Sequence, residues 1–351
     1  MASVTIDDVA RLANVSIKTV SRVLNREPNV RPETRQRVLA AALELRYRPN
    51  INARSLAGAR SYLLGIFFDN PSPGYIGDVQ LGAIAKCRAE SYHLMVEPVD
   101  LAHPNVAEEV SAMLATVRMD GVILTPPVTD HRAVMDVLDA AGTPFVRIAP
   151  DLDLERAPYV YMDDRRAAFE MTEHLIGLGH RDIAFVRGHP EHGASHHRFE
   201  GYEAALKAHR LDVRADRIAQ GYFSFRSGID AAEKLLAGPV KPTAVFASND
   251  DMALGVISVA NQMGLSVPSM LSVVGFDDAP TARFVWPSLT TVRQPMSDLA
   301  AAAADMLITR ATAGEDGRPA RRMLDFQIIV RESSAPPAVA DPGVEKPLQG
   351  A

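Results

Sequence analysis

Hydrophobic and polar residues follow two different patterns along the chain, and the pattern changes near residue 62. Before that position, apolar residues recur three or four positions apart in short segments, a spacing typical of amphipathic helices. Thr5 and Ser16, which favour helix starts, stand at the beginning of the first two segments. Three short helices around one small apolar cluster predict a helix-turn-helix bundle. We expect these helices at residues 5–12, 16–24 and 32–45.

Beyond residue 62, short apolar runs alternate with longer amphipathic segments. This alternation predicts repeated strand–helix units, and therefore an α/β body of parallel sheets flanked by helices on both faces. About 270 residues of such a pattern is long for one sheet, which indicates two lobes. We expect strands at 63–68, 92–98, 120–125, 144–149, 182–187, 243–247 and 271–276. Helices are expected near 77–90, 105–117, 131–140, 165–178, 195–209, 226–236, 249–263 and 295–310.

The two patterns divide the chain into four parts. Residues 1–48 form the all-α bundle, and residues 49–60 form a linker with a helix signature that is too short to be stable alone. Residues 61–334 form the two-lobed body. Residues 335–351 are rich in Pro, Ala and Gly and are expected to be disordered.

Charge is distributed unevenly between these parts. The whole chain has a formal net charge of −6, yet residues 1–60 carry eleven Lys and Arg against five Asp and Glu. A small basic module joined to an acidic body indicates that only the N-terminal part meets a polyanion. A chance cluster of surface arginines is the second interpretation.

Cysteine content and hydropathy indicate the cellular compartment in which the protein works. The lone Cys87 cannot form an internal disulfide, which fits a reducing cytoplasm. The N-terminus lacks the apolar stretch of a signal peptide, and no run of 18 apolar residues is present. We therefore expect a cytoplasmic, nucleoid-associated protein without a membrane partner.

The segment from Val4 to Asn25, VTIDDVARLANVSIKTVSRVLN, closely resembles the headpiece of the lactose-repressor/purine-repressor family of bacterial transcription regulators. Shorter motifs follow in the family's order to about Glu332, including LRYRPN, ARSLA, RFEGY, ASND, GFDD and LTTVRQ. The resemblance implies a body like periplasmic sugar-binding proteins, with an effector in the cleft between two lobes. It implies a first lobe of about 61–162 and 293–323 and a second lobe of about 163–292 and 324–334.

The resemblance assigns helix 16–24 to the major groove of operator DNA. Arg22 can donate two parallel hydrogen bonds to guanine, whereas Ile17 and Lys18 occupy positions that vary with operator sequence. Ser21 lies one turn after Ile17 and can face the same way. Ordinary cap and surface residues are the alternative interpretation. The residues expected to contact phosphates are Thr5, Ser16, Thr19, Ser21 and Asn25.

In the family, the leucines that match Leu56 wedge into a central minor-groove step and kink the duplex. Arg54 is expected to contact the minor groove or a phosphate, and Ala57 belongs to the same DNA-binding hinge. The alternative for Leu56 is packing against the body.

The family correspondence also implies an effector site that suits a polyhydroxylated ligand, with carboxylate, amide, guanidinium and aromatic groups together. Alternatively, these residues cap helices or belong to the apolar core, and Gln294 transmits a signal between the lobes. The expected effector-binding residues are His192, Arg198, Phe223, Asn249, Asp277 and Gln294.

Four histidines lie between His189 and His197. The segment is interpreted as an effector-binding loop, with a solvated loop and a metal site as alternatives. Ala194 stands where some relatives carry a hydroxyl residue, and His192 stands where the purine-binding branch carries arginine. These departures argue against a purine and leave a sugar or sugar derivative as the expected class.

These features together predict a repressor that binds a pseudo-palindromic operator as a homodimer under the control of a small effector. A corepressor-dependent regulator of the purine type and an activator remain open. We find no GxSxG, no P-loop and no GxGxxG that opens a helix. We therefore expect no catalytic residue, cofactor or metal. An enzyme and a transport binding protein are weaker alternatives, and the tail lacks the apolar heptads of a tetramerising coiled coil.

Overall fold

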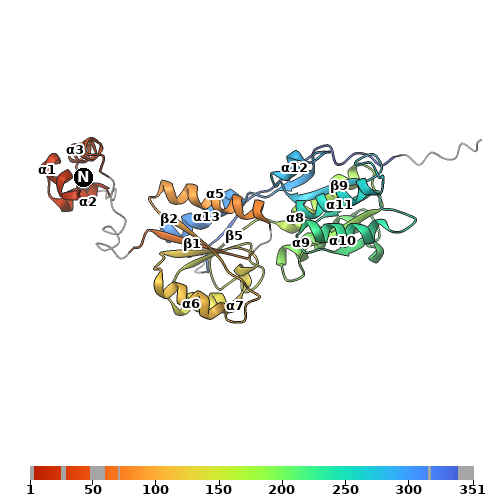
Figure 1. Ribbon diagram of the computed structural model, residues 1–351, viewed down its shortest axis with the longest axis horizontal. Helices are drawn as coiled ribbons and strands as arrows, with labels where there is room; N and C mark the ends of the chain where they lie inside the picture. The colour runs from red at the N-terminus through yellow and green to blue at the C-terminus, as the bar shows by residue number, and fades with distance from the viewer. Residues whose placement is uncertain (1–3, 25–28, 48–59, 70–71, 315–317, 339–351) are drawn as a thin grey trace, which may run out of the picture. The chain divides into compact units, whose positions relative to one another are not determined.

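The structure is a computed structural model that describes residues 4–24, 29–47, 60–69, 72–314 and 318–338 (Figure 1). It divides into two compact units, Met1–Tyr62 and Leu63–Ala351. Each unit has its own apolar core.

The first unit is the helix-turn-helix bundle that the sequence predicts. Its helices are α1 (Ile6–Ala13), α2 (Ile17–Leu24) and α3 (Pro32–Glu44). The helices pack around a core that includes Val9, Val20 and Val38. Asn14 adopts a left-handed conformation with φ of 51° and ends α1. The tight turn between α1 and α2 follows from this residue.

The second unit contains two six-stranded sheets. The first sheet has the order β11-β5-β4-β3-β1-β2, and all its pairs are parallel. Its strands are β1 (Leu63–Phe68), β2 (His93–Pro98), β3 (Gly121–Leu124), β4 (Phe145–Ile148), β5 (Tyr159–Tyr161) and β11 (Arg321–Met323).

The second sheet has the order β12-β10-β9-β8-β6-β7, in which only β12 pairs antiparallel to its neighbour. β8 is buried along its whole length, as expected for a strand covered on both faces. The strands are β6 (Ile183–Arg187), β7 (Ile218–Gln220), β8 (Ala244–Ala247), β9 (Ser272–Asp277), β10 (Thr290–Arg293) and β12 (Gln327–Ile329).

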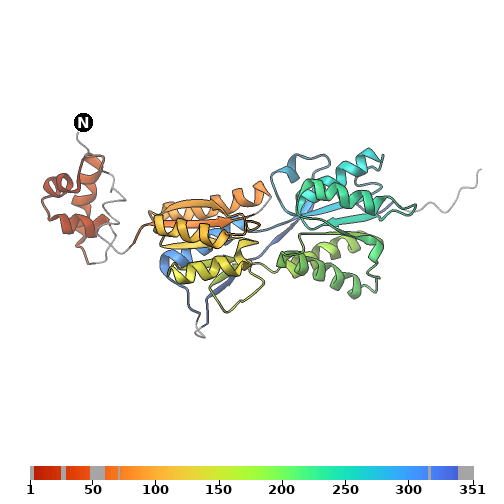
Figure 2. The same ribbon diagram turned by 60° about the horizontal axis from the view of Figure 1, so that its bottom comes forward.

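Helices cover both faces of each sheet, as the two views show (Figures 1 and 2). Helix α5 packs with α13 and α6 with α7 beside the first sheet, whereas α8 packs with α9 and α10 with α11 beside the second. The helices are α5 (Pro73–Ala89), α6 (Val106–Thr116), α7 (Arg132–Ala140), α8 (Asp164–Gly177), α9 (Gly193–Ala208), α10 (Phe225–Leu236), α11 (Asp250–Gln262), α12 (Thr281–Phe284) and α13 (Met296–Thr309).

The chain crosses between the lobes three times, after β5, after β10 and after β11. Arg293 still pairs with Asp277 in the second sheet, so this crossover begins one residue later than the lobe limit drawn from the sequence. The sequence pattern missed β5, β7, β10, β11 and β12, which have only three or four residues each.

The start of the proline-rich tail differs from its expected state. The Ala335 N–H donates to Ser272 Oγ at 3.0 Å, and the Ala335 carbonyl lies 2.9 Å from His180 Nε2. These contacts attach Ala335 to the second lobe, so the ordered body extends past residue 334. Residues 339–351 lie outside the described residues.

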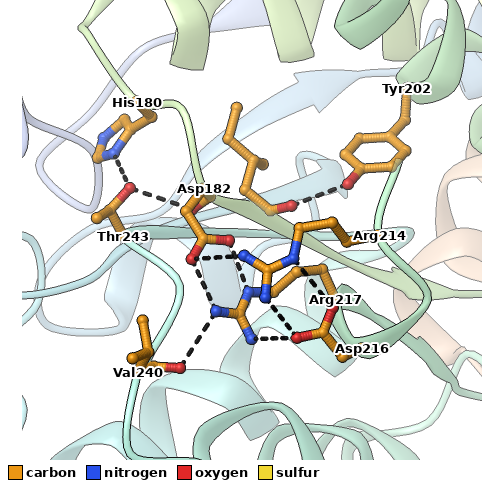
Figure 3. Close-up of polar contacts among 9 residues, drawn as sticks. His180, Asp182, Tyr202, Arg214, Asp216, Arg217, Val240 and Thr243 are labelled. Atoms are coloured by element: carbon orange, nitrogen blue, oxygen red, sulfur yellow. Dashed lines mark hydrogen bonds and ion pairs between the residues drawn. The ribbon is translucent and has the colours of Figure 1, made fainter. Parts of the chain in front are cut away.

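The amino ends of β6, β7 and β8 are joined by a polar network (Figure 3). Arg217 donates two hydrogen bonds to the Asp182 carboxylate, at 2.6 and 2.7 Å. The Thr243 hydroxyl donates to the Asp182 carbonyl at 3.1 Å, and Tyr202 donates to the Ile183 carbonyl at 2.8 Å. These contacts fix the strand starts at the edge of the sheet opposite the candidate site.

Candidate functional site

A cavity lies between the lobes of the second unit, beyond the carboxyl ends of the strands. This is the position at which open parallel sheets bind ligands. All six residues expected to bind an effector line it, so the structure brings together side chains that are up to 102 positions apart, from His192 to Gln294. The lining residues are Ser72, Tyr75, Pro126, Ala149, Asp164, His192, Ala194, Arg198, Phe223, Asn249, Asp277 and Gln294.

Arg198 is buried on α9 and is held from three sides. Its Nε donates to Asp164 Oδ1 at 2.7 Å, and its Nη1 donates to the Ser248 carbonyl at 2.7 Å. Its guanidinium carbon lies 3.6 Å from the centre of the Phe276 ring. These contacts fix the orientation of the group before any ligand arrives.

Asp277 ends β9 with a φ of 125°, outside the region that residues with a side chain ordinarily adopt. Gln294 Nε2 donates to Asp277 Oδ1 at 2.6 Å, and Arg198 Nη1 lies 3.9 Å from the same oxygen. Burial raises the pKa of Asp277 to about 7, although Arg198 and Gln294 oppose the shift. Near neutral pH the group is therefore divided between its carboxylate and carboxylic acid forms.

Asn249 lines the cavity, but both polar atoms of its side chain form hydrogen bonds within the protein. Its Oδ1 accepts from the Met252 N–H at 3.0 Å and caps α11, and its Nδ2 donates to the Phe223 carbonyl at 3.0 Å. This geometry matches the capping alternative that the sequence left open. It also holds Phe223 at the cavity wall.

His192 packs against Phe223 with ring centres 5.4 Å apart and ring planes tilted by 41°. Burial, followed by the neighbouring His189 and Arg198, lowers the pKa of His192 to about 4. The ring is consequently neutral near pH 7 and can present either an aromatic face or a nitrogen lone pair to the cavity.

The other histidines of the 189–197 segment have separate contacts. His196 Nε2 lies 2.7 Å from the Pro190 carbonyl, and His197 Nε2 lies 3.0 Å from Asp151 Oδ1 of the first lobe. Within the described parts of the chain, no three His, Cys, Asp or Glu side chains are grouped so that they could hold a metal ion. The metal alternative therefore receives no support from the geometry.

Sequence reasoning missed the contribution of the first lobe and of Asp164. Asp163 and Asp164 lie within three residues of the end of β5, and an acidic pair after a strand is a signal that could have been used once β5 was recognised. Tyr75 lies near the charges of Asp277, Arg198 and Asp164, and burial raises its pKa. Nothing in the sequence around Ser72 and Tyr75 marks them as cavity residues.

In the first unit, Ile17, Lys18 and Arg22 are exposed on α2, opposite the buried Val20 and Val23. Ser21 is half-buried beside them. One turn of helix separates Ile17 from Ser21 and Lys18 from Arg22, so these side chains follow one face.

Hydroxyl residues fix the starts of the two helices. The Thr5 N–H and hydroxyl donate to Asp8 at 2.9 and 2.8 Å, and Ser16 Oγ accepts from the Thr19 N–H at 3.2 Å. These contacts are the capping geometry expected from the sequence. The remaining DNA-binding candidates lie outside the described residues: Asn25, Arg54, Leu56 and Ala57.

Comparison with known proteins covers both units. Residues 5–50 match the family described as "Bacterial regulatory proteins, lacI family", and residues 172–334 match the "Periplasmic binding protein-like domain". The chain is 34% identical to "Probable HTH-type transcriptional repressor ExuR" of Bacillus subtilis (strain 168), over 94% of this chain and 98% of the relative. It is 38% identical to "Catabolite control protein A" of Priestia megaterium, over 87% and 92%.

Solved structures resemble the whole chain. A lac repressor dimer bound to operator and an anti-inducer has a TM-score of 0.75 at 27% identity, covering 95% of this chain and 100% of that one. The regulator CelR in complex with cellobiose has a TM-score of 0.72 at 30% identity, covering 94% and 100%.

No helix in the described part of the chain is long and apolar enough to cross a membrane. The bundle, the two-lobed body and the extended identity to named repressors lead to one conclusion. The chain belongs to the lacI family of bacterial regulatory proteins, and it is a DNA-binding transcription regulator with a periplasmic-binding-protein-like effector domain.

Proposed function

We propose that this regulator is a repressor whose affinity for a pseudo-palindromic operator is controlled by a sugar or sugar derivative in the cavity between the lobes. One observation supports this best: six side chains chosen from the sequence converge on a single cavity. A relative of similar fold, CelR, was solved as a complex with cellobiose. The supporting residues are His192, Arg198, Phe223, Asn249, Asp277 and Gln294.

The chemistry of the cavity favours a neutral ligand that carries several hydroxyl groups. Arg198 supplies fixed donors, Asp277 supplies oxygens that accept from hydroxyls, and Phe223 supplies an apolar face. Asp164 pairs with Arg198, which supplies the one guanidinium in the lining, and Asp277 adds partial negative charge near neutral pH, so a negatively charged ligand is disfavoured. Asn249 acts by positioning Phe223 and α11.

The exposed face of α2 reads the operator in this proposal. Arg22 donates to guanine in the major groove, and Ile17 and Lys18 contribute to the choice of neighbouring bases. Thr5, Ser16, Thr19, Ser21 and Asn25 contact phosphates, which position the helix without reading sequence. Leu56, with Arg54 and Ala57, acts in the minor groove.

A homodimer follows from the two half-sites of such an operator, and an apolar surface on the second lobe is suited to form it. Phe284 is 83% exposed and Trp286 is 79% exposed. They border a groove that also includes Phe225, Leu254 and Ile257. Large apolar groups gathered on a surface mark interaction sites, because burying them against a partner removes them from water.

Operator DNA and a metabolite effector place the proposed regulator in the cytoplasm, associated with the chromosome. We assign it no catalytic residue, cofactor or resident metal. The relatives named above are regulators, and the cavity chemistry described here requires only reversible binding.

Selection of binding sites from a randomised DNA library, followed by titration with neutral sugars, tests the proposal. We expect a near-palindromic site whose affinity changes when one sugar is added. Replacing Arg22 by Ala should weaken binding to that site by about 1–3 kcal/mol and relax the preference at one base pair per half-site.

The matched control is Arg11→Ala, which removes the same charge from an exposed position on α1. It should lose less affinity than Arg22→Ala and keep the base preference. Equal affinities of Arg22→Ala and the unmodified protein would show that α2 does not read bases.

A further inference from the structure

Four rings form a continuous row that starts in the cavity and ends at the surface: Phe223, His192, His189 and Tyr222. Neighbouring ring centres are 5.4 Å apart for Phe223 and His192, 4.9 Å for His192 and His189, and 5.5 Å for His189 and Tyr222. Phe223 is buried, the two histidines are half-buried and Tyr222 is 50% exposed. The row therefore leads outward from the ligand cavity.

Sheet topology places this row at the open side of the cleft. The loops that carry it follow β6 and β7, at one edge of the second sheet. Two of the three chain crossovers involve β10 and β12, which lie at the other edge of this sheet. The third, after β5, leads into α8, which packs against β10 and β12. Since the covalent connections join the lobes along that other edge, the β6–β7 edge borders the entrance.

The backbone under the row is held firmly. Phe223 has a left-handed φ of 58°, and its ring packs so closely on Gly188 that a Cβ there would lie 2.0 Å from it. The Tyr222 N–H donates to Ser227 Oγ at 2.9 Å, and Gln220 Nε2 donates to the Gly188 carbonyl at 2.5 Å. A positive φ at a bulky aromatic residue is unusual and persists only where such contacts impose it.

We propose that this aromatic row is a second ligand subsite, which binds the outer ring of a disaccharide or similar glycoside whose inner ring occupies the cavity. The inference rests on the proposed function. The inner ring contacts Arg198 and Asp277, and the outer ring lies against His189 and Tyr222. Tyr222 is accordingly a specificity-determining residue that distinguishes two-ring ligands from monosaccharides.

The chemistry of the row fits a sugar ring better than a charged group. Aromatic faces attract the weakly polarised C–H groups on one face of a pyranose, and they also bury apolar area. His192, at the junction of the two subsites, is neutral at pH 7 because burial lowers its pKa. The Tyr222 hydroxyl, at the exposed end, can bond the outer hydroxyls of the same ring.

The test is calorimetry on the full-length protein with matched neutral pairs, such as glucose with cellobiose, glucose with maltose, and galactose with lactose. For at least one pair we expect the disaccharide to bind about 3- to 10-fold more tightly than its monosaccharide, the range expected of one aromatic contact. Tyr222→Ala should remove most of this gain and leave the monosaccharide affinity unchanged. Tyr222→Phe, which keeps the ring, should retain it.

The outcomes separate the two proposals. If monosaccharides bind as tightly as every disaccharide, or if Tyr222→Ala weakens both to the same extent, the subsite is refuted and the sugar-controlled repressor stands. If no sugar of either size binds the unmodified protein, the proposed function fails and takes the subsite with it.

Discussion

Asp182 and Asp277 lie at opposite ends of the strands of the second sheet, here called its amino edge and its carboxyl edge, and their carboxyl groups differ in how many hydrogen bonds they accept. At the amino edge, the Asp182 carboxylate receives two hydrogen bonds from Arg217, and Arg214 adds a further charge at 3.6 Å (Figure 3). At the carboxyl edge, the Asp277 carboxyl receives one hydrogen bond, from Gln294. A carboxylate whose hydrogen-bond donors all come from the protein has a structural role, whereas one that can accept further hydrogen bonds is able to bind a ligand.

Backbone conformation separates the same two edges. Phe223 and Asp277, both at the carboxyl edge, have positive φ values of 58° and 125°. The amino edge has a left-handed residue at Arg210, after α9, but none at Asp182, Arg217 or Thr243. Strain of this kind costs about 1–3 kcal/mol per residue and is found where function requires an uncommon geometry. The fold tolerates it at the edge where ligands bind.

The largest expected effect on stability comes from removing the Asp182 carboxylate at the amino edge. Replacing Asp182 by Ala leaves the Arg217 guanidinium, with a side chain 6% exposed, without its main partner. Removing one member of this partly buried pair should lower the free energy of unfolding by roughly 1.5–3 kcal/mol, because Arg217 loses two charge-assisted hydrogen bonds. Urea denaturation measures this. Asp212→Ala, at an exposed position nearby, is the control and should change stability by less than about 0.5 kcal/mol.

A second expectation concerns pH and acts at the carboxyl edge. Burial raises the pKa of Asp277 to about 7 in the folded protein, above its ordinary value of 3.8. The stability that Asp277 contributes is therefore fully present below about pH 4 and is lost as the pH rises through about 7. Ligand hydroxyls that donate to the carboxylate should bind more tightly over the same rise, by about tenfold between pH 6 and pH 8.

Calorimetry across that pH range checks the expectation, with Asp277→Asn as the variant that cannot titrate. The variant should bind sugar weakly and show a flatter pH profile. If sugar affinity still depends steeply on pH in Asp277→Asn, the titrating group is not Asp277. The proposed difference in charge between Asp182 and Asp277 would then be wrong.

The smallest expected effect concerns Asn249, which combines features of both edges because it lines the cavity and caps α11. Asn249→Ala should lower the free energy of unfolding by about 1 kcal/mol, the usual cost of a lost N-cap. Sugar affinity should fall slightly as Phe223 loses the hydrogen bond to its carbonyl. A complete loss of sugar binding with unchanged stability would instead make Asn249 a direct ligand contact.

Features with local causes were predictable. The bundle helices follow from apolar spacing, and Thr5, Asp8 and Asn14 act within one or two turns of their own helix. Strands such as β1 and β8 were visible because a strand buried on both faces needs a continuous apolar run. The short strands β11 and β12 carry polar residues, and their conformation depends on the partner strand that supplies hydrogen bonds.

The candidate site required more than local pattern. Its six expected residues were identified by resemblance to a family, since no spacing connects His192 with Gln294. The structure added Asp164, Tyr75 and Ser72 to the lining and showed that Asn249 is occupied as a cap.

The sequence by itself determined the helix-turn-helix unit, the alternating α/β body and the family, because each is specified by residues close together in the chain. Only the tertiary structure decided which carboxyl groups are satisfied and which are available. Asp182 and Asp277 are the same residue type beside strands of one sheet. Their difference arises from Arg217 meeting the first across 35 positions and from burial of the second against Arg198 and Gln294.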